Sequence, residues 1–198
     1  MKADSKSNNK SVFVTMGASS HAEEARAFRD LYCTHPSAVE ALLNVETFSR
    51  DIWEPAAGLL HISKTLEAHG HRVRSSDIEA RCEGVEEKDF LFMDCERWQG
   101  DIITNPPYST AGEFVLKALQ SIENGAKVAM LLRLLFLEGQ QRRREIFENT
   151  PPHTVYVFSR RTVCARNGDF SARIAAAQCF AWFVWVKGYK GDTVIKWI

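Results

Sequence analysis

The fold is decided by the stretch Asp101-Ile102-Ile103-Thr104-Asn105-Pro106-Pro107-Tyr108. Its first four residues form a short strand-like run, and a helix-like pattern of apolar residues begins at Thr110. The residues from Asn105 to Tyr108 are therefore expected at the carboxyl end of a strand. Open α/β sheets bind their ligands at that end of their strands.

The chemistry of this tetrapeptide suits one kind of ligand. Pro106 has no N–H and offers a carbonyl acceptor, while Pro107 restricts Pro106 to an extended conformation. The amide oxygen of Asn105 and the carbonyl of Pro106 can thus form a stiff pair of acceptors, with the ring of Tyr108 beside them. Such a site fits a planar group carrying an NH₂, because accepting both hydrogens aims the nitrogen lone pair at an electrophile. Taken alone, the same residues are equally well explained as a turn.

The composition is that of an ordinary globular chain. The 198 residues are 45% hydrophobic and 25% charged, and Lys+Arg 25 balances Asp+Glu 25, so any basic surface has to be local. The five cysteines form no CxxC pair and the six histidines no HxxxH pair, so we expect reduced thiols and no metal site. No apolar run reaches the length of a membrane span, and the first residues lack a signal-peptide core. We therefore expect a cytoplasmic protein without a membrane contact.

Strand-like and helix-like runs alternate through most of the chain, which predicts a mostly parallel sheet with helices on both faces. Residues 1–10 are expected to be a disordered tail before a single domain of residues 11–198, with 12–14 a candidate edge strand and 21–30 a candidate helix. The predicted strands are 51–53, 71–76, 90–93, 101–104, 127–135, 154–158, 175–185 and 194–198, and the predicted helices are 37–44, 59–69, 110–124 and 138–149. Ser37 with Glu40 is a candidate capping box for the first of these helices.

The first strand–turn–helix has the pattern of a nucleotide-binding crossover. Gly58 allows close approach of a ligand to the turn after Glu54, and Asp77 follows the next strand at about the spacing at which an acid meets ribose hydroxyls. The turn contains a single glycine, so a purely structural turn is an equal alternative. Asp89 and Phe90 similarly suit an adenine amine and ring face, or else the start of a strand and a core side chain.

Two clusters of arginines stand out: Arg142-Arg143-Arg144 and Arg160-Arg161. Charge runs are usually solvated faces, which is the favoured interpretation of the first cluster. Because both clusters follow predicted strands, contact with phosphate is the alternative.

Together, these stretches resemble the class I S-adenosylmethionine-dependent methyltransferases, and among them the enzymes that methylate adenine N6 in DNA. The resemblance rests on the order of Thr34-His35-Pro36, Glu54-Pro55-Ala56-Ala57-Gly58, Asp77, Asp89-Phe90-Leu91 and Asn105-Pro106-Pro107-Tyr108. Residues 136–139, 164–168, 182–185 and 196–198 resemble small methyltransferases of phages and prophages in particular. The family implies a Rossmann-like, doubly wound, seven-stranded sheet with one antiparallel strand near the C-terminus.

The resemblance also implies a role for each matching residue. Asn105 and Pro106 would hold the target NH₂, with Pro107 and Tyr108 completing the catalytic motif and the Tyr108 ring stacking on the target base. A base in a duplex would have to be flipped out, or the substrate would be single-stranded. The S-adenosylmethionine site implied by the family comprises Tyr32, Thr34, Glu54, Pro55, Ala56, Gly58, Asp77, Ile78, Asp89, Phe90 and Asn105. Arg133, Arg142, Arg160 and Arg161 are candidates for phosphate contact.

The sequence departs from the family at two points. Leu60 stands where the family usually has a second glycine, and a leucine there can crowd the cofactor. The chain also has no room for a large target-recognition domain, because only residues 159–171 form a long loop after the sixth predicted strand. We therefore expect short or loose sequence specificity in DNA, or a partner that supplies it.

The sequence is compatible with several functions. The same chemistry on adenine in RNA, on cytosine N4 or on a protein glutamine is the nearest alternative to a DNA substrate. A non-catalytic nucleic-acid-binding module derived from a methyltransferase is the alternative that Leu60 supports. A nicotinamide-dependent oxidoreductase is disfavoured, since the turn lacks G-x-G-x-x-G spacing. We expect a monomer or a weak dimer in the cytoplasm, of the host cell if the gene is carried by a phage.

Overall fold

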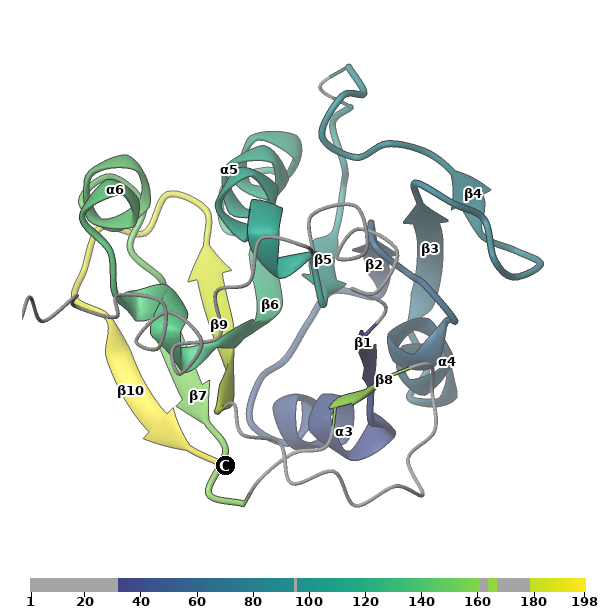
Figure 1. The fold of residues 1–198 in the computed structure, drawn as a ribbon, viewed down its shortest axis with the longest axis horizontal. Coiled ribbons are helices and arrows are strands. Elements are labelled where there is room, and N and C mark those ends of the chain that lie inside the picture. Colours follow the sequence, from purple (N-terminus) through teal and green to yellow (C-terminus); the bar gives the residue numbers. More distant parts are fainter. Residues whose placement is uncertain (1–31, 95, 161–163, 167–178) are drawn as a thin grey trace, which may run out of the picture. The chain divides into compact units, whose positions relative to one another are not determined.

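The computed structural model describes residues 32–94, 96–160, 164–166 and 179–198 (Figure 1). Its strands are β1 (Tyr32–Thr34), β2 (Asp51–Glu54), β3 (Arg72–Asp77), β4 (Glu86–Glu87), β5 (Asp101–Thr104), β6 (Lys127–Arg133), β7 (Thr154–Val157), β8 (Cys164–Arg166), β9 (Phe180–Val186) and β10 (Val194–Trp197). Its helices are α3 (Pro36–Leu43), α4 (His61–Ala68), α5 (Ala111–Ser121) and α6 (Gln140–Arg142), with 3-10 turns η1 (Tyr108–Thr110) and η2 (Leu134–Leu137) and a π-helical turn η3 (Arg143–Phe147). The expectations for residues 1–10, 12–14 and 21–30 lie outside the described residues.

Eight strands form the central sheet in the order β10-β7-β9-β6-β5-β2-β3-β4. Strand β9 is antiparallel to both β6 and β7, and the other neighbouring pairs are parallel. The expected α/β, doubly wound, mostly parallel sheet with an antiparallel strand near the C-terminus is therefore confirmed, with eight strands rather than seven. The extra strand is the edge strand β10, beside β7. Strands β1 and β8 form a separate antiparallel pair.

The sheet is buried on both faces, so its central strands are apolar at successive positions. Helices α3 and α4 cover one face and α5 covers the other, as Figure 1 shows. Strand β9 illustrates the alternation, since Trp182 packs with the α3–α4 side and Phe183 with the α5 side, each with no exposed surface. Continuous apolar runs such as residues 180–186 are therefore strands here rather than helices.

The strand order reverses between β2 and β5, and this reversal positions the site. From β2 the chain moves outward to β3 and β4, then returns to β5 on the other side of β2. The carboxyl ends of β2 and β5 thus lie side by side at the topological switch point, where open α/β sheets bind ligands. The turn from Glu54 to Gly58 follows one of these strands, and Asn105 follows the other.

The predicted strand over residues 90–93 is wrong. These residues form turns, and the strand beside β3 is the short β4 instead. The cause is Asp89, whose Oδ1 accepts the backbone N–H groups of Leu91 and Phe92 at 3.0 and 3.3 Å. An aspartate that bonds the following backbone favours a turn over an extended ladder.

The remaining differences concern the ends of elements and the loop predicted over residues 159–171, in which residues 164–166 form β8. Helix α3 is capped by His35, whose Nδ1 accepts the N–H of Ser37 at 3.2 Å, rather than by the predicted Ser37–Glu40 box, because Pro36 takes the first helical position. Helix α4 begins after Leu60 rather than at residue 59. The predicted helix over 138–149 is divided into α6 and η3, and the end of the strand predicted over 127–135 becomes η2.

Candidate functional site

Asn105 and Pro106 lie directly after β5, as predicted. The Nδ2 of Asn105 donates to Oγ1 of Thr34 at 3.2 Å, and Thr34 is buried in β1. This bond joins residues far apart in the chain and turns the amide oxygen of Asn105 away from Thr34. Strand β1, which begins at Tyr32, therefore lies beside the motif, and its pairing with β8 places residues 164–166 at the same end of the sheet.

Tyr108 is the last residue of the motif and the first of η1. Its ring lies 5.7 Å from the ring of Phe180 at 38°, and the guanidinium carbon of Arg133 lies 4.6 Å from the Tyr108 ring centroid. Pro106 is buried, and the carbonyl of Pro107 accepts the N–H of Thr110 at 3.2 Å, which closes the turn. The motif is thus a packed, rigid turn that carries an aromatic ring covered by a cation.

The turn after β2 has an unusual backbone. Gly58 has φ 49° and Leu60 has φ 64°, and Leu60 is the one non-glycine residue with positive φ in the described part of the chain. A left-handed conformation costs an L-residue about 1–2 kcal/mol. Leu60 thus adopts a backbone conformation that favours glycine.

Glu54 is buried, and its carboxylate faces α4. Its Oε2 accepts the backbone N–H of Ser63 at 2.8 Å and also the Ser63 hydroxyl, which is 2.6 Å from the hydroxyl of Ser75. Burial raises the pKa of Glu54 to about 8 despite these hydrogen bonds. Its contacts therefore hold the turn against α4 and β3, while Pro55 and Ala56 line the same turn.

Asp77 ends β3 next to this turn. Its Oδ2 accepts the N–H of Gly58 at 2.8 Å, and its Oδ1 accepts the N–H of Glu79 at 3.2 Å and lies 3.7 Å from Arg81. The following residue, Ile78, is 68% exposed. A carboxylate beside an exposed aliphatic side chain suits the hydroxyls and the ring of a nucleoside.

The segment after β4 presents a second apolar side chain. Phe92 is 89% exposed, whereas Phe90 is 2% exposed and packs between Trp53 and Phe114 with ring centroids 5.2 and 5.1 Å apart. Phe90 therefore lies in the core, which is one of the two interpretations of this residue, rather than against an adenine ring. Sequence reasoning missed Phe92, because its apolar neighbours made the whole run look like a buried strand.

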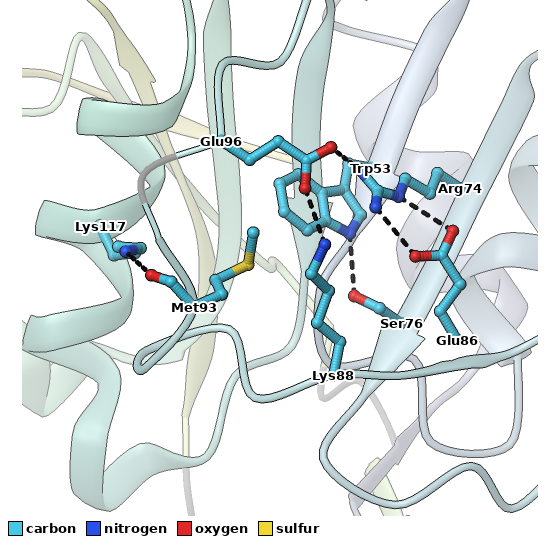
Figure 2. Close-up of polar contacts among 8 residues, drawn as sticks. All are labelled: Trp53, Arg74, Ser76, Glu86, Lys88, Met93, Glu96 and Lys117. Atoms are coloured by element: carbon cyan, nitrogen blue, oxygen red, sulfur yellow. Dashed lines mark hydrogen bonds and ion pairs between the residues drawn. The ribbon is translucent and has the colours of Figure 1, made fainter.

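A network of charged side chains fixes the position of this segment (Figure 2). Arg74 on β3 donates two hydrogen bonds to Glu86 at 3.0 and 2.9 Å and one to Glu96 at 2.6 Å. Lys88 donates to the other oxygen of Glu96 at 2.7 Å, so the segment from 88 to 96 is closed at its two ends. The bonds to Glu86, and then those to Glu96, raise the pKa of Arg74. The Arg74 guanidinium also lies 4.6 Å from the centroid of the Trp53 ring.

Two further contacts fix the same region in Figure 2. The Nζ of Lys117 on α5 donates to the carbonyl of Met93 at 2.6 Å, and the indole N–H of Trp53 donates to Oγ of Ser76 at 2.9 Å. The sequence offered only one signal for this network, an excess of charges between residues 79 and 97.

The arginines expected to contact phosphate differ in their position relative to the motif. Arg133 lies on the ring of Tyr108, but Arg142 donates to the carbonyls of Leu135, Phe136 and Glu138 and thereby ends η2. Arg160 is exposed, and Arg161 lies outside the described residues. Of the four, the structure brings Arg133 to the motif.

Other kinds of site are less well represented. In the described ranges, no group of three or more His, Cys, Asp or Glu side chains is arranged to hold a metal ion. No helix in the same ranges is long and apolar enough to cross a membrane. A surface cavity of about 560 Å³ lies at the opposite, amino edge of the sheet, where Asp101 accepts the N–H groups of Ser49 and Lys127. The hydrogen bonds of Asp101 hold neighbouring segments together at this edge. The cavity lies at the opposite end of the strands from the motif.

Solved structures with a similar fold include class I S-adenosylmethionine-dependent methyltransferases. A candidate member of that class from Listeria monocytogenes has a TM-score of 0.54 at 10% identity, over 81% of this chain and 62% of its own, so this chain spans less than two thirds of it. An O-methyltransferase predicted in Agrobacterium tumefaciens has a TM-score of 0.58 at 11% identity, over 82% of this chain and 85% of its own.

A third similar structure is the type IIG restriction endonuclease BpuSI, with a TM-score of 0.54 at 12% identity. The likeness covers 88% of this chain and 26% of that one. A scan of the sequence against protein-family models gave no match, and a search of the curated proteins gave none either. At these identities the likeness concerns the fold.

Proposed function

We propose that this protein transfers a methyl group from S-adenosylmethionine to an exocyclic amino group, namely N6 of adenine in DNA. The observation that carries the proposal is the position of Asn105 and Pro106, directly after β5 and beside β2 at the reversal of strand order. One of the proteins with this fold is a restriction endonuclease, which adds support for a DNA substrate.

The residues on the cofactor side fit S-adenosylmethionine. Asp77 offers a carboxylate for the ribose, Ile78 and Phe92 offer exposed apolar surfaces for the adenine, and Oδ2 of Asp89 can accept the adenine amine. Gly58 carries no side chain, so a cofactor could contact the main chain of the turn at that residue. When bound, the cofactor supplies an electrophilic methyl group next to a positively charged sulfur.

The residues on the substrate side orient the amine. The amide oxygen of Asn105 and the carbonyl of Pro106 accept the two N–H hydrogens, so the lone pair of the nitrogen points at the methyl group. The Tyr108 ring fixes the plane of the base. Transfer would form the N–CH₃ bond and break the bond between the methyl group and the sulfonium sulfur, which would leave as a neutral thioether. The nitrogen would then carry the positive charge and lose a proton to water, because an alkylated aromatic ammonium is acidic. A flipped or single-stranded nucleotide is required, since a stacked base cannot reach these acceptors.

The test is a methylation assay with a labelled methyl group and four substrates: duplex DNA, single-stranded DNA, RNA and a protein extract. Digestion of each product to nucleosides or amino acids identifies the methylated group, and we expect N6-methyladenine from DNA. Asn105→Ala should lower turnover at least 100-fold, on the order of what loss of one positioned polar group costs, while the exposed Asn44→Ala should leave it unchanged. Methylglutamine, N4-methylcytosine or methylated RNA would move the substrate to that class. Salt-sensitive binding to DNA by a protein that binds no cofactor and methylates none of the four substrates would favour a binding module.

A further inference from the structure

The guanidinium of Arg133 lies over the ring of Tyr108. Arg133 is the last residue of β6, the neighbour of β5, and its guanidinium carbon lies 4.6 Å from the centroid of the Tyr108 ring. Guanidinium groups stack on aromatic faces, and such contacts contribute about 0.5–2 kcal/mol. The cation thus covers a face of the ring assigned above to the target base.

Arg133 has few other partners. Its Nε is buried and makes no hydrogen bond to any described residue, and no carboxylate in the described ranges pairs with it. The contrast with other arginines is clear, since Arg74 pairs with two glutamates, Arg142 bonds three carbonyls and Arg143 pairs with Glu148 at 3.0 Å. An unsatisfied buried donor is costly, so this arrangement of Arg133 is easily exchanged for one that satisfies the donor.

We propose that Arg133 is a placeholder for the target base. Its guanidinium occupies the face of Tyr108 until a base arrives, and then moves to a phosphate of the bound nucleotide. The inference deepens the proposed function and rests on it for the identity of the nucleotide. The exchange itself requires only that a planar group binds on the Tyr108 ring.

Two physical arguments support the exchange. A base and a guanidinium cannot lie on the same face of one ring, so one must leave when the other binds. A cation is also unfavourable there during the reaction, because the amine nitrogen gains positive charge as the methyl group is transferred. A phosphate, by contrast, accepts from several guanidinium N–H groups at once and satisfies Nε.

The experiment compares two fluorescent ligands, 2-aminopurine riboside without phosphate and a short single-stranded DNA containing one 2-aminopurine. Arg133→Ala should bind the nucleoside about 2- to 30-fold more tightly than the original protein, the range that corresponds to loss of one cation–π contact. The same variant should bind the oligonucleotide more weakly at low salt, with the slope of log K against log salt reduced by about 0.7, which is the loss of one phosphate contact.

Arg133→Lys separates the two roles, since lysine keeps the charge for the phosphate but stacks less well on a ring. It should keep the salt slope and still bind the nucleoside more tightly. Arg72→Ala removes an exposed arginine at the amino end of β3 and should change the binding of neither ligand. Thermal unfolding of each variant confirms that it is folded.

Weaker binding of both ligands by Arg133→Ala would overturn the placeholder role and show that Arg133 orders the ring. Unchanged nucleoside binding in both Arg133 variants would also overturn it. A protein that binds the nucleoside as expected but never the oligonucleotide would leave the exchange on Tyr108 supported and contradict the DNA substrate, so the two failures are distinguishable.

Discussion

The backbone N–H of Gly58 donates to Oδ2 of Asp77 at 2.8 Å. This hydrogen bond joins the turn after β2 to the end of β3, two neighbouring parallel strands. The same carboxylate is the candidate for the cofactor ribose. Asp77 therefore shapes the turn, and if it also binds the ribose, its removal should lower both stability and cofactor affinity.

Asp77→Ala should weaken binding of S-adenosylmethionine at least 10-fold, because a hydrogen bond to a charged group contributes about 1.5–3 kcal/mol. Asp77→Asn keeps an oxygen for Gly58 and should preserve more stability than alanine while still losing affinity. Calorimetric titration measures both, with the exposed Asp192→Ala as the matched control. Equal affinity of the original protein, Asp77→Ala and Asp77→Asn for S-adenosylmethionine would mean that Asp77 does not bind the ribose.

The positive φ of Leu60 predicts an asymmetry between two adjacent leucines. Leu60 has φ 64°, whereas Leu59 is not among the residues with positive φ. Glycine relieves the strain at Leu60 but only adds backbone freedom at Leu59. Leu59→Gly should therefore lower the free energy of unfolding by at least about 1 kcal/mol more than Leu60→Gly, as measured by urea denaturation.

The same two variants address the departure of Leu60 from the family. If the leucine side chain crowds the cofactor, Leu60→Gly should bind S-adenosylmethionine more tightly and Leu59→Gly should not. Equal losses of stability in both variants would contradict the backbone argument.

The sequence predicted the central half of the fold because the relevant signals are local. The ends of β2, β3 and β5 carry Glu54, Asp77 and Asn105, and short apolar runs before each residue identified the strands. The topological switch follows from the order of those strands.

Long-range and side-chain effects were not predictable in the same way. The pairing of β1 with β8 joins Tyr32 to Arg166, and no local pattern connects them. Strand β4 consists of two glutamates, which a strand pattern does not favour, and it depends on Arg74 binding Glu86. The exposure of Phe92 depends on the turn at Asp89, which competes with an apolar run that resembles a strand.

The network in Figure 2 predicts a positioning role for Glu96. Its side chain is 39% exposed and binds both Arg74 and Lys88, so each ion pair should contribute under about 1 kcal/mol to stability. Glu96→Ala should nevertheless lower cofactor affinity about 3- to 10-fold, because the segment carrying Asp89 loses its closure. Faster hydrogen exchange at the amides of Leu91 and Phe92 would report the loosened segment.

The matched control for that experiment is Arg97→Ala, whose side chain is 85% exposed. It should change neither affinity nor exchange. A fall in melting temperature of Glu96→Ala without any change in affinity would assign the network to stability alone.

Glu54 predicts a dependence of stability on pH. Burial raises its pKa from 4.5 to about 8 in the folded protein. Between these values the folded state holds a proton that the unfolded state releases, so the free energy of unfolding falls as pH rises through that window. The slope for one group is at most about 1.4 kcal/mol per pH unit, and it vanishes below pH 4.5 and above about pH 8.

Glu54→Gln tests this dependence with a neutral side chain of the same shape. Its amide oxygen can take the place of Oε2 and accept both the N–H and the hydroxyl of Ser63, so these two contacts are retained. Between pH 6 and pH 8 the original protein should lose stability relative to the variant, as measured by urea denaturation at each pH. Parallel curves for the two proteins would mean that Glu54 is already ionised when folded, and that the turn after β2 carries a buried negative charge stabilised by Ser63.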